Sequence, residues 1–67
     1  MIQEGQVWAN DMQKFKVLGF EPSGHALIFG ITKVDYLNVD ENGKREIPVD
    51  ILEEFLAKEM SDFKLVS

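Results

Sequence analysis

The residues in this chain best suited to bind a metal lie in one short polar run, residues 38–43. Oxygen-bearing side chains stand at its positions one, three and five and a glycine at six, as at the start of a calcium-binding EF-hand loop: Asn38, Asp40, Asn42 and Gly43. The rest of that pattern is missing, because Arg45 occupies the hydrophobic position and Val49 the position of the bidentate glutamate. We interpret the run as a solvated hairpin turn and predict no metal site.

Catalysis would depend on the single histidine, His25, because the chain has no cysteine. His25 follows Ser23 and Gly24 in a predicted turn, and no acid is placed in the sequence to orient its imidazole ring. The chain also has no glycine-rich loop that could hold phosphates. We therefore predict no catalytic residues, no cofactor and no enzymatic activity.

Aromatic side chains could instead bind a partner, in the way SH3 domains bind Pro-rich peptides. In a chain of 67 residues most of the five Phe, one Tyr and one Trp are needed for the core. Trp8 and Tyr36 have a polar tip and neighbours of mixed polarity. We predict that these two remain available to a protein partner.

Acidic residues gather in the second half of the chain, at Glu46, Asp50, Glu53, Glu54, Glu59 and Asp62. The net charge of −5 disfavours direct binding to nucleic acid or to an anionic membrane surface. Two interpretations of these acids stay open. They form an ordinary solvated face, or Glu53, Glu54 and Glu59 mimic phosphates and occupy the basic cleft of a host nucleic-acid-handling or defence protein.

Period-two apolar patterns predict strands at residues 6–9, 14–20, 26–34, 44–47 and 63–66, with residues 35–39 as a further β-capable segment. Residues 14–34 form the central hairpin, and Gly30 predicts either a bulge or a close backbone approach. The Asn42-Gly43 pair favours a type I′ turn.

After Pro48 the period changes to that of a helix. Asp50 followed by Glu53 three residues later resembles a capping box, so we expect a helix from Ile51 to Met60. Its apolar side would carry Ile51, Leu52, Phe55, Leu56 and Met60, with most charged residues opposite. Such a helix packs on a sheet.

These elements predict one mainly β domain over residues 1–67: a small SH3-like antiparallel barrel of about five strands, with one C-terminal helix before the last strand. An α+β domain with an open sheet is the alternative. The strings GQVW at 5–8, FKVLGF at 15–20, Ile47-Pro48 and FKLV at 63–66, with the acidic Asn-Gly turn, resemble small SH3-like proteins encoded by phages and prophages. The resemblance spans most of the chain and implies no common activity. The helical insert at 51–60 departs from it.

We therefore predict a non-enzymatic interaction module of phage or prophage type that binds a protein partner. The acidic mimic is the alternative. The first residues do not form a secretory signal and no apolar run approaches about 20 residues, so we expect a cytoplasmic protein that binds no membrane. A thin core with many large apolar residues also predicts a possible homodimer through Phe20, Phe29 or Leu37.

Overall fold

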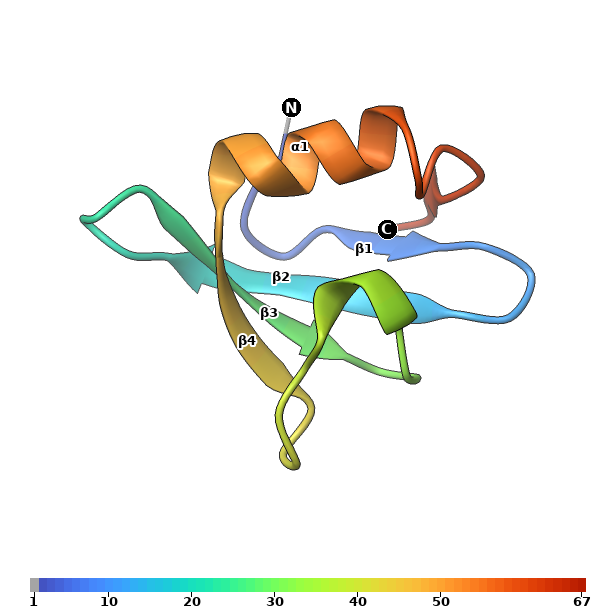
Figure 1. Ribbon diagram of the computed structural model, residues 1–67, viewed down its shortest axis with the longest axis horizontal. Coiled ribbons are helices and arrows are strands. Elements are labelled where there is room, and N and C mark those ends of the chain that lie inside the picture. The colour runs from blue at the N-terminus through green and yellow to red at the C-terminus, as the bar shows by residue number, and fades with distance from the viewer. Residues whose placement is uncertain (1) are drawn as a thin grey trace.

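The computed structural model describes residues 2–67, which form one antiparallel sheet, one α-helix and one short 3₁₀ helix (Figure 1). In chain order the elements are β1 (Val7–Ala9), β2 (Lys14–Phe20), β3 (His25–Gly30), η1 (Asp35–Leu37), β4 (Lys44–Pro48), α1 (Val49–Ala57) and β5 (Lys64–Leu65). The sheet order is β4-β3-β2-β1-β5. The mainly β prediction is confirmed. The sheet is open, because β4 and β5 lie at its two edges, so it is not closed into a barrel.

Alternation along the strands decides which face of the sheet is buried. In β2, Phe15 and Val17 are buried whereas Lys14 and Lys16 are exposed, as expected when successive side chains point to opposite faces. The face that carries the buried residues, here called the inner face, is the one that α1 covers. The core consists of Phe15, Val17, Ala26, Ile28, Val34, Leu37, Ile47, Leu52, Met60 and Phe63.

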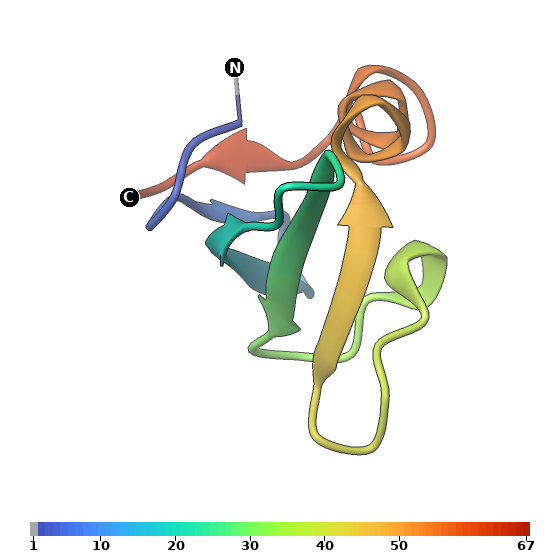
Figure 2. The ribbon, with the colours of Figure 1, turned by 90° about the vertical axis from the view of Figure 1, so that its left-hand side faces the viewer.

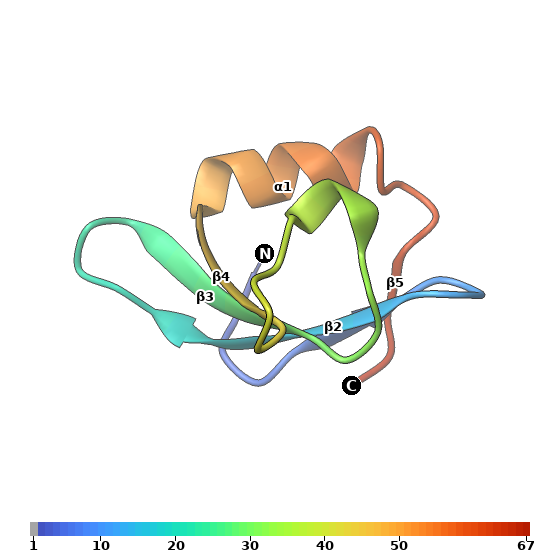
Figure 3. The same ribbon diagram turned by 60° about the horizontal axis from the view of Figure 1, so that its bottom comes forward.

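Both helices lie on the inner face of the sheet. Figure 3 shows α1 and η1 on the same side, and Figure 2 shows α1 end-on above β4. Leu52 of α1 and Leu37 of η1 are both fully buried in the core. Arg45 of β4 donates from Nη1 to the carbonyl oxygen of Leu37 at 2.6 Å, which fixes η1 to the sheet. Neither helix is long and apolar enough to span a bilayer, within residues 2–67.

The bulge and the close backbone approach of the central hairpin lie at two different positions. The β2–β3 register shifts between Val17 and Gly19, so the bulge lies in β2 and not at Gly30. Gly30 is instead a close backbone approach: a Cβ atom there would lie 2.9 Å from the carbonyl oxygen of Thr32 and 3.4 Å from Val39. Of the two roles predicted for Gly30, the close approach is confirmed.

The segment after Gly30 differs from the prediction. β3 ends at Gly30 instead of continuing to residue 34, and residues 35–39 contain η1 instead of an extended segment. The physical reason is burial, because the chain folds over the inner face and carries Val34 and Leu37 into the core. The apolar residues that suggested a strand therefore belong to a loop and a short helix, where they cover the core.

The turn before β4 is not of type I′. That turn requires positive φ at both central residues, but Asn38 is the one non-glycine residue of positive φ within residues 2–67. Oδ1 of Asp40 instead accepts hydrogen bonds from the backbone N–H groups of Asn42 and Lys44, at 2.8 and 2.9 Å. Gly43, with φ of 80°, supplies the left-handed position.

The helix and the last strand are present, but their predicted boundaries were wrong. α1 begins at Val49, directly after Pro48, which is the N-cap and makes no side-chain cap hydrogen bond. Asp50 accepts only from the neighbouring N–H of Ile51, at 2.9 Å, so the expected capping box does not form. The helix ends at Ala57 instead of residue 60, and β5 is limited to two residues paired with β1.

Two glycine-to-alanine variants test whether the backbone at Gly30 lies too close to its neighbours to accept a Cβ atom. We expect Gly30→Ala to lower the free energy of unfolding by about 1–3 kcal/mol, because its methyl group would overlap the Thr32 carbonyl. Gly19→Ala is the matched control, since its Cβ would meet only the Glu4 side chain at 3.7 Å, and we expect a change below about 1 kcal/mol. Urea denaturation of both variants measures the free energies of unfolding. Equal destabilisation by the two substitutions would contradict the close backbone approach at Gly30.

Candidate functional site

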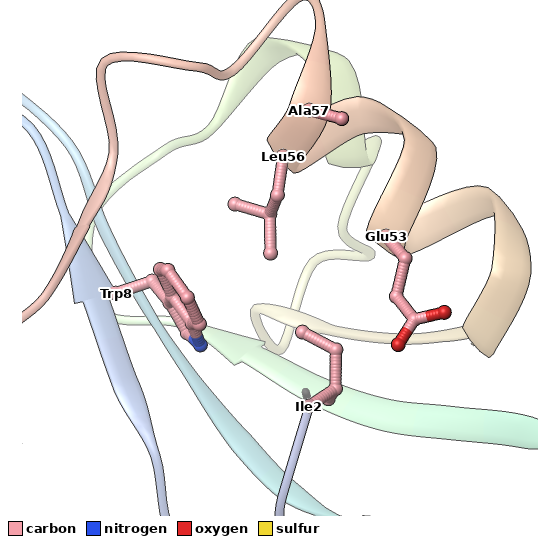
Figure 4. A pocket seen from close by; sticks show the side chains of 5 residues that line it. All are labelled: Ile2, Trp8, Glu53, Leu56 and Ala57. Atoms are coloured by element: carbon pink, nitrogen blue, oxygen red, sulfur yellow. The ribbon is translucent and has the colours of Figure 1, made fainter.

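A pocket of about 290 Å³ lies between α1 and β1 (Figure 4). It is lined by Ile2, Trp8, Glu53, Leu56 and Ala57. Figure 4 shows Trp8 on one side and Glu53 on the other, with Leu56 and Ile2 between them. The pocket therefore has mainly apolar walls and a single carboxylate, and it brings together two of the predicted binding residues.

The helix supplies three of the five lining residues because of its periodicity. Glu53, Leu56 and Ala57 stand at i, i+3 and i+4, which places them on one side of α1. Leu52 of the same helix is fully buried in the core, which fixes α1 on the inner face of the sheet. Ile2, from the segment that precedes β1, completes the lining. The pocket therefore depends on segments that are far apart in the sequence.

Trp8 is held in place by pairing and by hydrogen bonds. In β1 it stands opposite Phe15 of β2 and Leu65 of β5. Its indole Nε1–H donates to Oε1 of Gln6 at 3.3 Å, and the same oxygen accepts the backbone N–H of Gln3 at 2.8 Å. Because the polar edge of the indole already has an acceptor, the carbon surface of the ring is what lines the pocket.

Glu53 is half-buried beside these apolar walls. Within residues 2–67 its carboxylate takes part in no hydrogen bond or ion pair. Both carboxylate oxygens are therefore available to a group that enters the pocket.

The other predicted binding residues lie elsewhere. Tyr36 is half exposed on η1, and its ring packs at a tilt against Phe55, with centroids 6.2 Å apart. Glu54 is exposed on α1, and Glu59 is exposed beyond the end of the helix. The five predicted residues thus do not form one site. Sequence reasoning missed Ile2, Leu56 and Ala57 as site residues, since no local pattern distinguishes a pocket wall from core or surface.

The predicted self-association patch is only partly exposed. Phe20 is 45% exposed and Phe29 is half-buried, but Leu37 is fully buried. Leu37 was wrongly assigned to this patch, because η1 carries it into the core. The homodimer itself stays a prediction.

His25 lies apart from the pocket. It begins β3 instead of lying in the turn, and its Nδ1 is 3.0 Å from Oγ of Ser23 in an exposed hydrogen bond. Among residues 2–67, those that line the α1–β1 pocket carry no hydroxyl, imidazole or thiol group. Within residues 2–67, no three side chains of the metal-ligating types lie close enough together to hold an ion.

Comparison with protein-family models, with curated proteins and with solved structures finds no match for the chain. The site must therefore be interpreted from its own geometry.

The role of Asp40 can be tested directly. We expect Asp40→Ala to lower the free energy of unfolding by about 1–2 kcal/mol, because two backbone N–H groups lose their acceptor. Asp40→Asn keeps an acceptor oxygen and should lower the free energy of unfolding by less. Urea denaturation of the two variants measures this difference.

Millimolar calcium should leave the thermal midpoint of the wild-type protein unchanged, since the loop lacks the twelfth-position carboxylate. A calcium-dependent rise that disappears in Asp40→Ala would show instead that the loop binds the ion.

Proposed function

We propose that this protein is a small, non-enzymatic interaction module that binds a protein partner through the α1–β1 pocket. The observation that carries the proposal is the pocket itself, in which the indole of Trp8 and the carboxylate of Glu53 face one hollow. Protein interfaces are often dominated by a few side chains that fill small, well-packed pockets. A rigid strand and a helix frame this pocket.

The size of the pocket favours a single side chain of a partner. At about 290 Å³ it lies at the lower limit of the cavities that hold small-molecule ligands. It can accept one large side chain while the rest of the partner lies across α1 and the segment before β1. Its lining supports binding more than catalysis, because it offers one carboxylate and no nucleophile.

The acidic mimic receives less support from the arrangement of its three residues. A phosphate mimic needs its charges on one continuous surface. Glu53 lines the pocket, Glu54 is exposed on α1, and Glu59 follows the end of the helix. One of the three carboxylates therefore lines the pocket, and the other two lie outside its lining.

The resemblance to phage and prophage SH3-like proteins stays a proposal, as does a cytoplasmic location. We propose an SH3-like arrangement in which the sheet is open and α1 covers its inner face. The five antiparallel strands and the helix before the last one support this.

Blocking the pocket tests the proposed function. Ala57 is exposed at its edge, so Ala57→Gln should obstruct it without disturbing the core. Ser61→Gln, an exposed position after the helix, is the control. With the affinity tag placed after Ser67, capture of a partner from host-cell lysate should be lost in Ala57→Gln and kept in Ser61→Gln. Both variants should unfold at the wild-type temperature.

The salt dependence of partner capture distinguishes the pocket from the acidic mimic as the mode of binding. A partner that inserts a side chain into the pocket should be captured at both low and high salt. A mimic should lose most of its affinity as salt rises. Capture by Ala57→Gln equal to that of the wild-type protein would refute the pocket as the binding site.

A further inference from the structure

The unpaired carboxylate in the pocket indicates the chemistry of the side chain that enters it. We propose that the pocket binds an arginine side chain of the protein partner, with the guanidinium group paired to the carboxylate of Glu53 and the rest of the side chain against the apolar wall to which Trp8 contributes. The inference rests on the proposed function, because it names the group that occupies the same site.

The desolvation cost of Glu53 favours a charged occupant. In the free protein the half-buried carboxylate of Glu53 has no partner within residues 2–67, and water must solvate it through the open side of the pocket. An apolar side chain that filled the pocket would displace this water and leave a buried, unpaired charge. A cationic side chain replaces the lost solvation with an ion pair.

The charge distribution of the molecule also favours a cation at this site. α1 carries Asp50, Glu53 and Glu54 and no basic residue. Among the bases, Lys14 and Lys16 lie on the opposite, outer face of the sheet, because they alternate with buried residues in β2. Lys58, exposed directly after α1, is the one base that adjoins the helix in sequence, so the three acids of α1 outnumber it.

Arginine fits the site better than lysine. Its planar guanidinium can donate two hydrogen bonds to the two oxygens of one carboxylate and can stack on an indole ring, and it is less strongly hydrated than an ammonium group. The indole N–H of Trp8 is already bonded to Gln6, so the ring offers its π surface. The methylene groups would pack against Leu56 and Ile2.

A probe molecule with one guanidinium group tests the proposal on the full chain. N-acetyl-arginine methylamide is titrated while NMR follows the indole N–H of Trp8, the single tryptophan of the chain. The citrulline analogue has the same shape without the charge, and the lysine analogue carries an ammonium group. We expect the arginine probe to bind at least about tenfold more tightly than the citrulline analogue and several-fold more tightly than the lysine analogue.

Two matched variants locate the effect. Glu53→Gln should weaken binding of the arginine probe about tenfold, to the level of the citrulline analogue. Glu54→Gln removes the same charge one residue away, on an exposed side chain, and should leave the affinity unchanged. Superimposable backbone spectra would show that both variants keep the fold.

Several outcomes would overturn the proposal: equal binding of arginine and citrulline, equal losses in the two variants, tighter binding of lysine, or no shift at Trp8. These outcomes are distinct from failure of the proposed function. If Ala57→Gln abolishes partner capture but the arginine probe does not bind, the pocket remains the docking site and only its proposed occupant is wrong. If Ala57→Gln captures the partner normally, the proposed function fails.

Discussion

One short helix has to cover the inner face of a sheet that is wider than the helix. Five strands span about 19 Å, at about 4.8 Å between neighbours, whereas an α-helix with its side chains is about 10 Å across. Figures 1 and 3 show α1 running nearly along β2, so its length adds little coverage across the strands. Val34 and Leu37, before and in η1, and Met60 and Phe63, after α1, are therefore also buried in the core. Between α1 and β1 a pocket remains.

The fold could be predicted from the sequence wherever a local pattern coincided with burial. The strand β2 follows from an apolar run that alternates in burial over Lys14, Phe15, Lys16 and Val17, and its predicted limits, residues 14–20, are confirmed. The apolar pattern predicted the wrong structure at residues 31–39. Val34 and Leu37 there pack on the inner face of the sheet, and this face forms only when all the strands have come together. The prediction also failed at the start of α1. Pro48 ends β4 with an extended backbone and the helix begins at the next residue, so Pro48, and not Asp50, occupies the N-cap position.

The candidate site could be predicted only in part, for a related reason. Trp8 and Glu53 have the chemistry of binding residues, and the structure brings them into one pocket. Tyr36 has similar chemistry, but its ring packs on Phe55. This contact joins η1 and α1, and the spacing of the two residues in the sequence does not predict it. Ile2 was missed because its contribution depends on where the N-terminal segment lies relative to α1. The chemistry of a side chain can be inferred from its residue type. Which side chains line one pocket can be seen only in the tertiary structure.

Trp8 lines a pocket that is open to solvent and in which Glu53 supplies the charge. Collisional quenching of tryptophan fluorescence tests it without any ligand, because Trp8 is the single tryptophan. Normalised to free N-acetyl-tryptophanamide, caesium should quench Trp8 more efficiently than iodide. Glu53→Gln should narrow this difference far more than Glu54→Gln, which makes the same change in net charge. If both ions quench Trp8 equally, or if neither reaches it, the pocket is not the open, anionic site described here.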